Sequence, residues 1–203
     1  MLRGESSGAR AAGDSLLPEV VEPLLQGRFG RPYTFIERCE STQRELPADA
    51  SEGAVVATDE QTGGRGRLGR PWYAEPGTSL LFSVNLRPAV ETANLPELSV
   101  VAGLATAEAI RQVTGLAPGI ELPNDLLLGG RKLAGILAEA REDRVVLGIG
   151  INVNVTREKL PENVDTEPTS LLVELGRPVE RARLLAAVLQ ELERRYDRWV
   201  SEA

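Results

Sequence analysis

Residues 126–155, LLLGGRKLAGILAEAREDRVVLGIGINVNV, contain three apolar runs separated by two short turns. The first two runs, 126–128 and 131–138, flank two glycines, and a two-glycine turn between apolar runs predicts a β-hairpin. A polar turn at 141–144 then leads into a third predicted strand at 145–155. This segment therefore predicts three consecutive strands joined by hairpins.

The elements on either side of this segment give the fold class. The sequence predicts further strands at 33–39, 53–58 and 79–86, and helices at 94–114 and 178–200. We expect Asn94 to cap the first of these helices and Gly115 to end it. Strands joined by hairpins and mixed with a few helices predict an α+β domain with a mixed β-sheet and flanking helices.

The composition excludes several classes of function. The 203-residue chain has a net charge of −7, whereas non-specific DNA binding depends on a basic surface. With no histidine and one cysteine, Cys39, it lacks the residues of a Cys/His zinc site or of a histidine-based catalytic triad. No segment approaches the ~20 apolar residues of a membrane helix. We expect a cytoplasmic protein without DNA or membrane partners.

The densest chemical signal is GGRGRLGRPW, residues 63–72, with four glycines and three arginines. Glycine lets the backbone approach a ligand closely, and arginine offers a planar set of donors to carboxylates and phosphates. We therefore expect Arg65, Arg67 and Arg70 to bind an anionic ligand. Two other interpretations stay open: a solvated turn whose arginines pair with surface acids, and an RNA-binding segment.

A second cluster of polar residues lies in ELPNDLLLGGRKLAGILAE, residues 121–139. Asn124 and Asp125 stand just before a predicted strand, and Lys132 follows the two-glycine turn. Ordinary turn chemistry, with a lysine on a strand edge, explains these residues taken alone. The run after Lys132 is small or apolar, which predicts burial on both faces. Gly135 within it predicts close approach of a ligand or another backbone.

A third signal is GIGIN, residues 148–152. Two glycines in a β-branched strand weaken it unless something packs against them. The candidates are a flat apolar ligand and a packed aromatic ring.

Together these segments resemble the biotin protein ligase family. The family's GRGRxGRxW pattern is matched at 64–72, its WPND segment followed by KxxGIL at 122–125 and 132–137, and its GxGxN strand at 148–152. Ser41-Thr42 matches the Ser-Thr pair before the family's first helix. Four motifs in register are far more specific than any one of them.

The resemblance implies a fold related to class II aminoacyl-tRNA synthetases and a biotin–[biotin carboxyl carrier protein] ligase activity. Such an enzyme uses ATP to convert biotin into biotinyl-5′-AMP and diphosphate. It then transfers biotin to a specific lysine of a biotin carboxyl carrier protein, such as an acetyl-CoA carboxylase subunit. Mg²⁺ is expected to accompany ATP, without a metal site of the protein's own.

The resemblance also implies a domain organisation and a set of site residues. We expect an N-terminal tail and short helix over 1–30 and a catalytic domain over 31–203, with no helix-turn-helix or SH3-like C-terminal domain evident; a homodimer is left open. Biotin binding is assigned to Ser41, Thr42, Gln61, Gly64, Arg65, Arg67, Lys132, Gly135, Leu137 and Gly148. ATP or adenylate binding is assigned to Arg65, Arg67, Arg70, Trp72, Asn124, Lys132 and Asn152. The catalytic candidates are Lys132, Arg65 and Asp125.

The chain departs from the family pattern at some positions. Glu121 and Leu122 replace a basic residue and a tryptophan, and Gln43 replaces an asparagine. Two alternative functions therefore stay open. One is a lipoate or octanoate ligase-type acyltransferase of the same superfamily, and the other is a degenerate biotin-binding regulatory protein.

Overall fold

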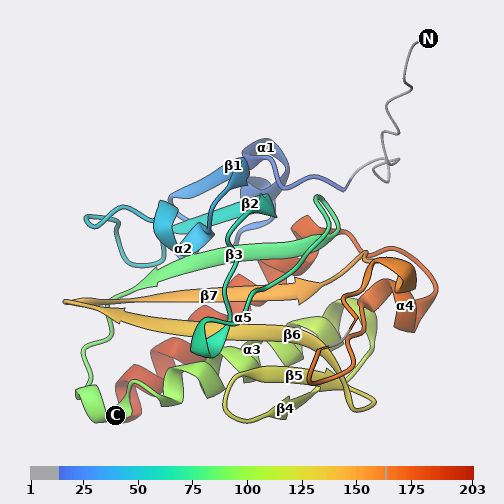
Figure 1. Cartoon of the computed structure of the whole chain (residues 1–203). Coiled ribbons are helices and arrows are strands. Elements are labelled where there is room, and N and C mark those ends of the chain that lie inside the picture. Colours follow the sequence, from blue (N-terminus) through green and yellow to red (C-terminus); the bar gives the residue numbers. More distant parts are fainter. Residues whose placement is uncertain (1–13, 163) are drawn as a thin grey trace.

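The computed structural model describes residues 14–162 and 164–203. Within these ranges the chain forms a seven-stranded sheet in the order β1-β2-β3-β7-β6-β5-β4 (Figure 1). β1 and β2 are parallel, and the other neighbouring pairs are antiparallel. The strands are β1 Tyr33–Cys39, β2 Val55–Gln61, β3 Ser79–Leu86, β4 Gly119–Glu121, β5 Asp125–Leu128, β6 Arg131–Arg141 and β7 Arg144–Asn152. The prediction of an α+β domain with a mixed sheet and flanking helices is confirmed.

The hairpins expected between residues 126 and 155 form the adjacent strands β5, β6 and β7, of which β7 is the middle strand of the sheet. Gly129 and Gly130 both have positive φ, 58° and 79°, so a two-residue turn joins β5 to β6 without strain. β6 then pairs with β7, from Ala134 opposite Ile151 to Arg141 opposite Arg144. The strand predicted to continue to residue 155 ends at Asn152.

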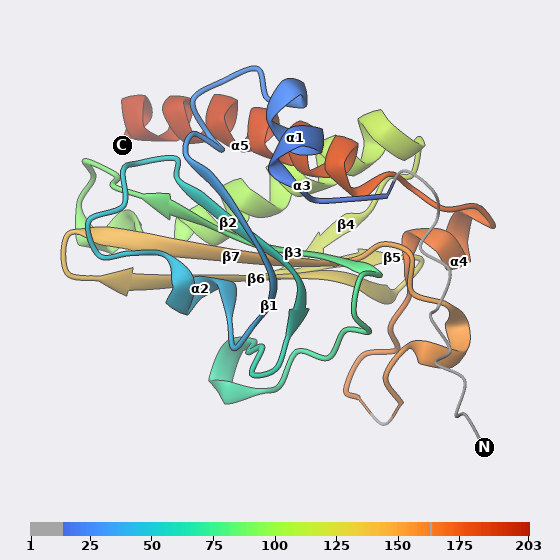
Figure 2. The same ribbon diagram turned by 90° about the horizontal axis from the view of Figure 1, so that it is seen from above.

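The helices divide unequally between the two faces of the sheet. The longest two, α3 (Glu97–Thr114) and α5 (Arg181–Glu202), pack against each other and cover one face. Figure 2 shows the short α2 (Thr42–Glu45) on the opposite side, beside the loop that follows β2. The other helical segments are α1 Pro18–Val21, η1 Glu22–Leu24, η2 Arg67–Gly69, η3 Thr92–Asn94, η4 Arg157–Lys159 and α4 Leu171–Leu175. One face of the sheet is therefore buried by the two long helices, and the other carries the short α2 and loops.

One predicted helix cap is wrong. Asn94 does not cap α3, because it lies in the 3-10 turn η3, and Pro96 occupies the cap position. The predicted end is confirmed: Gly115 has φ 80° and its N–H donates to the carbonyl of Arg111. Within the described residues, no helix combines the length and apolar character that a membrane crossing requires.

The segment before β1 contributes to the main core. Leu16, Val21, Leu25 and Phe29 are buried with residues of the sheet and α5. Residues 1–13 of the expected N-terminal tail lie outside the described residues, and the boundary at residue 31 stays a prediction.

A buried ion-pair group fastens α5 to this segment and to the sheet. The Arg181 side chain is 1% exposed, and its guanidinium contacts Asp14 and Asp59, at 2.8 Å in each case. Asp14 also accepts a hydrogen bond from the backbone N–H of Arg181, at the first turn of α5. The charge of one buried cation is thus shared between two carboxylates from distant parts of the chain.

Candidate functional site

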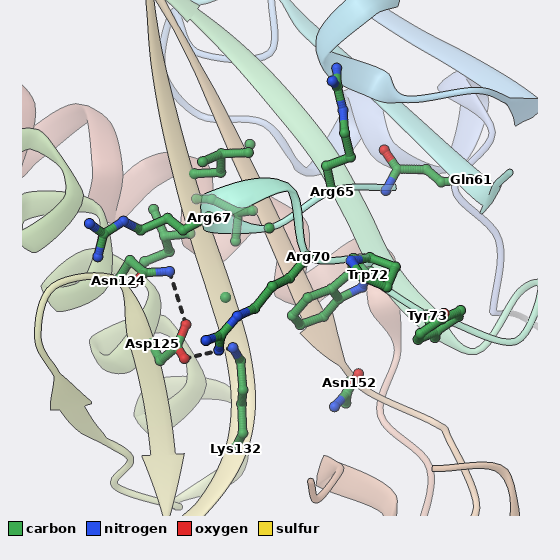
Figure 3. Close-up of a pocket in the computed structure, with 18 of the residues that line it drawn as sticks. Gln61, Arg65, Arg67, Arg70, Trp72, Tyr73, Asn124, Asp125, Lys132 and Asn152 are labelled. Atoms are coloured by element: carbon green, nitrogen blue, oxygen red, sulfur yellow. Dashed lines mark hydrogen bonds and ion pairs between the residues drawn. The ribbon is translucent and has the colours of Figure 1, made fainter. Parts of the chain in front are cut away.

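A cavity of about 760 Å³ opens on the sheet face that lies opposite α3 and α5 (Figure 3). Its floor is formed by β6 and β7. Its walls are α2, the arginine–glycine loop at 63–72, and a second loop at 161–168. Three segments that are far apart in the sequence therefore meet over the central strands.

Two glycines let an aromatic ring lie flat on the floor. Gly135 and Gly150 are register partners on β6 and β7, and the indole of Trp72 covers both. A Cβ atom at either glycine would lie 2.8 Å from a carbon of this indole, closer than real side chains pack. The sequence left open whether a flat apolar ligand or an aromatic ring packs against the glycines of β7. At Gly150 it is the aromatic ring of Trp72. At Gly135 the predicted close neighbour was a ligand or another backbone, whereas the structure places the side chain of Trp72 there.

The arginine–glycine loop is itself a small hairpin. The backbone N–H of Trp72 donates to the carbonyl of Gly64 at 2.9 Å, and that of Gly66 donates to Arg70 at 2.7 Å. Leu68 at the tip has φ 59°, a left-handed conformation that is uncommon for a leucine, and its side chain is 86% exposed. The loop is anchored by Trp72 and carries its arginines at the cavity.

The three arginines of this loop differ in their partners. Arg70 forms an exposed ion pair with Asp165 of the second loop, with nitrogen and oxygen 2.5 Å apart. Arg65 and Arg67 also line the cavity and have no ion pair with any other described residue. The interpretation of a solvated turn thus fits Arg70, whereas Arg65 and Arg67 remain available to an anionic ligand.

Lys132, Asp125 and Asn124 form a connected polar group at the other side of the floor. The Lys132 ammonium lies 2.6 Å from Oδ2 of Asp125, and Asn124 donates to Oδ1 of the same carboxylate at 3.1 Å (Figure 3). Nζ of Lys132 is also 5.8 Å from the centroid of the Trp72 ring. Lys132 does not lie on an exposed strand edge, because its backbone pairs with β5 on one side and with Glu167 and Thr169 on the other.

Uncharged polar groups line the cavity where α2 meets the end of β2. Oε1 of Gln61 accepts hydrogen bonds from the backbone N–H of Thr42 at 2.9 Å and from its hydroxyl at 3.2 Å. The same hydroxyl is 2.7 Å from that of Ser83. Ser41 precedes Thr42 as the helix cap and is buried. These hydrogen bonds fix the orientation of a polar wall.

The cavity brings together almost all of the residues predicted from the sequence. Its lining includes Ser41, Thr42, Gln61, Arg65, Arg67, Arg70, Trp72, Asn124, Asp125, Lys132, Gly135, Leu137, Gly148 and Asn152. Gly64 is not among the lining residues: it is buried, next to Gln61 and the backbone of Trp72. Glu121 and Leu122, where the chain departs from the family pattern, are exposed and also lie outside the lining.

Some lining residues were not predicted. They include Gln43, Tyr73, Phe82 and residues of the second loop such as Asp165. Gly150, one of the two glycines noted in GIGIN, also lines the cavity. The loop carries no recognisable motif, so its place at the cavity follows from the tertiary fold.

Comparison with known proteins places these features in one family. The model of the biotin/lipoate A/B protein ligase family matches residues 35–156. A biotin–[acetyl-CoA-carboxylase] ligase of Mycobacterium tuberculosis is 38% identical over 202 residues, which cover 92% of this chain and 74% of that protein. The bifunctional ligase/repressor BirA of Bacillus subtilis is 37% identical over 170 residues. The chain spans about half the length of this relative and of its Bacillus spizizenii counterpart.

A solved structure shares the fold. The biotin protein ligase of Aquifex aeolicus, determined in complex with biotin and ATP, superposes with a TM-score of 0.76 at 33% identity. The match covers 84% of this chain and 73% of that protein. The expectation of the class II synthetase-like fold of this family is confirmed.

Proposed function

The chain belongs to the biotin/lipoate A/B protein ligase family, and from this premise we propose that it is a biotin–protein ligase. It activates biotin with ATP to biotinyl-5′-AMP and transfers the biotinyl group to a lysine of a biotin carboxyl carrier protein. The observation that carries this proposal is the polarity of one cavity. Cationic side chains and a set of uncharged hydrogen-bonding groups line the same cavity.

The cationic side chains suit a ligand with a carboxylate and phosphates. Lys132 comes from the floor, and Arg65 and Arg67 come from the loop above it. Fixed cations stabilise the charge that builds on phosphoryl oxygens, and one well-placed donor contributes about 10²–10³ in rate. In the first step a carboxylate oxygen of biotin attacks the α-phosphorus of ATP, and the bond to the leaving diphosphate breaks. We assign Lys132 and Arg65 to this step.

The second step transfers the acyl group to an amine. The neutral lysine amine of the acceptor attacks the carbonyl carbon of biotinyl-5′-AMP, an amide bond forms, and AMP leaves. The amine must lose a proton, and Asp125 lies beside Lys132 with its carboxylate 19% exposed. We assign to Asp125 the role of orienting this amine and accepting its proton.

The remaining lining residues are assigned to the ring of biotin, to its pocket or to the adenylate. Ser41, Thr42 and Gln61 bind the ring system of biotin. Gly135, Leu137 and Gly148 shape its pocket, and Gly64 is the buried glycine near the start of the arginine–glycine loop. Arg70, Trp72, Asn124 and Asn152 bind the adenylate portion.

Mg²⁺ would reach the site with ATP. The described residues contain no group of three or more His, Cys, Asp or Glu side chains that could hold a metal ion. Mg²⁺ would be coordinated mainly by the phosphates and would neutralise charge there. The residues assigned above do not need to contribute a metal cage.

The polar wall favours biotin over lipoate. A cyclic urea can exchange hydrogen bonds with Thr42, Gln61 and Ser41, whereas the dithiolane ring of lipoate cannot. Sites built to hydrogen-bond a ligand discriminate strongly against analogues that leave their polar groups unpaired. For this reason lipoate or octanoate ligation is the weaker candidate.

Diphosphate release separates the alternatives. The protein is incubated with ATP and either biotin, lipoate or octanoate. The proposal predicts release with biotin and little with the other two acids. Release with lipoate or octanoate alone would assign the chain to the other branch of the family, and biotin binding without diphosphate release would indicate a regulatory protein.

We further propose that residues 31–203 form the catalytic domain and that the acceptor is a carrier domain of a biotin-dependent carboxylase. The name of the Mycobacterium tuberculosis relative supports this acceptor. Incubation with such a domain, biotin and ATP tests it by intact mass.

A further inference from the structure

Gln43 is a buried polar side chain that the proposed reaction does not use. It lies on α2, directly after Thr42, and is 6% exposed. It lines the same cavity as the residues assigned to biotin. A glutamine amide in such a place needs partners for its hydrogens and for its oxygen.

The amide nitrogen is held by two strands at once. Nε2 donates to the carbonyl of Leu137 on β6 at 3.1 Å and to that of Val146 on β7 at 3.3 Å. Since both acceptors are backbone carbonyls, the nitrogen and oxygen ends of this amide are assigned without ambiguity. Both N–H groups are used, and the side chain is tied to the floor.

The absence of a side chain at Gly148 leaves room for the side chain of Gln43. A Cβ atom there would lie 3.1 Å from Cδ and 3.2 Å from Cγ of Gln43, so the glutamine side chain lies directly over the glycine. Gly148 and Gly150 are two residues apart on β7 and therefore share a face. Gln43 covers the first of them and Trp72 the second. The two glycines on the floor are therefore covered by different side chains, Gly148 by an amide and Gly150 by an indole.

Gln43 and Lys132 lie at different positions along β6, because Gln43 donates to the carbonyl of Leu137. Leu137 is five residues beyond Lys132 on β6, which corresponds to about 17 Å of extended strand. On the proposed function, Ser41 and Thr42 bind the bicyclic ring with its cyclic urea, and Gln43 follows them on α2. Gln43 therefore lies at the ring end of the ligand.

The backbone carbonyl of Gln43 accepts a hydrogen bond from Arg141 at 3.0 Å. The side-chain oxygen Oε1 has no hydrogen-bond partner among the described residues, yet it is not one of the fully enclosed unpaired atoms. It is an acceptor at the ring end of the cavity. We infer that Gln43 is a specificity-determining residue, whose side chain closes the ring end of the cavity and whose oxygen accepts a hydrogen bond from a ring N–H of the ligand. This inference rests on the proposed function, because it takes the ligand to be biotin.

The test compares biotin with its two N-methyl derivatives, each methylated at one urea nitrogen. Methylation removes one N–H donor and adds bulk at the same place. The dissociation constants of the three compounds are measured by calorimetry for the wild-type protein and for variants. For the derivative methylated at the nitrogen facing Gln43, we expect wild-type binding at least about tenfold weaker than binding of biotin.

Two substitutions distinguish the two roles of Gln43, which are to accept a hydrogen bond and to close the ring end of the cavity. Gln43→Asn shortens the side chain by one methylene and leaves room for the added methyl, so the discrimination should fall about tenfold. Gln43→Met keeps the length without the acceptor, so biotin should bind about tenfold more weakly and the methyl derivative should not recover. Gln190→Asn is the matched control, since Gln190 is exposed on α5 and bonded to Gln26. Thermal unfolding confirms that each variant is folded.

The outcomes are distinguishable. Loss of discrimination in Gln43→Asn but not in Gln190→Asn supports the inference. Unchanged discrimination in folded Gln43→Asn and unchanged biotin affinity in Gln43→Met overturn it, while tight biotin binding by the wild type leaves the proposed function standing. A wild-type protein that does not bind biotin would overturn both.

Discussion

The Lys132 ammonium lies 2.6 Å from the Asp125 carboxylate in a cavity that both residues line. The pair is partly solvated, with the two side chains 30% and 19% exposed. Asn124 holds the second carboxylate oxygen, so the acid keeps a fixed orientation. A cation and a carboxylate are thus placed together where the proposed reaction first needs positive charge and then a proton acceptor.

Lys132→Ala should abolish adenylate formation without unfolding the protein. It removes a cation from the site of phosphoryl transfer, and we expect diphosphate release to fall by at least about 10²-fold. The chain has one other lysine, Lys159, which pairs with Glu75 at 3.1 Å and lies outside the cavity. Lys159→Ala is therefore the matched control and should remain active. Near-normal turnover by Lys132→Ala would refute the assigned role.

Arg65→Gly should weaken retention of biotinyl-5′-AMP. The substitution removes a cation that forms no ion pair with any other described residue, and it leaves the loop hairpin free to form. Released adenylate acylates amines indiscriminately, so biotin should appear on an added bystander protein. Arg177→Gly, at an exposed position outside the cavity, is the control. If bystander labelling equals that of the control, the loop does not retain the adenylate.

Gly150→Ala should displace Trp72 from the floor. The added Cβ would lie 2.8 Å from the indole, so the ring must move, and biotin affinity should fall by about tenfold or more. Gly119→Ala is the control, because a Cβ there meets nothing within 4 Å. Tryptophan fluorescence and biotin titration report the ring and the site separately. Wild-type affinity in Gly150→Ala would show that the stacked ring is not needed.

Arg181→Met should destabilise the fold. It leaves Asp14 and Asp59 without their shared cation, and breaking a buried ion pair costs about 3–5 kcal/mol of unfolding free energy. Arg183→Met, on the exposed side of α5 where Arg183 pairs with Glu180, should cost less than about 1 kcal/mol. Urea denaturation measures both. Equal stabilities would mean that the buried group contributes nothing.

Local patterns predict six of the seven strands and most of the site. The strands at 33–39 and 79–86 were predicted to the residue, because each is a β-branched, aromatic or leucine-rich run between turn residues. The strand β4 was not predicted, since it is three residues long and gains its pairing from β5. Asn94 matched a cap in the sequence but lies in a 3-10 turn whose presence that pattern does not reveal.

Contacts between distant segments could not be read from the sequence. The glycines at 135 and 150 predicted a close neighbour, but nothing local identified it as Trp72. Asp165 meets Arg70 only because two loops converge over the floor. The position of the Gln43 side chain depends on backbone carbonyls of β6 and β7, which are distant in the sequence.

The most direct test of the proposed function is the intact mass of an acceptor domain carrying a single lysine, after incubation with this protein, biotin and ATP. The account predicts a mass increase of one biotinyl group on that lysine, with one diphosphate released for each acceptor modified and no increase when ATP is omitted. An unmodified acceptor in the presence of biotin and ATP, or a lipoyl adduct formed in preference to a biotinyl one, would contradict it.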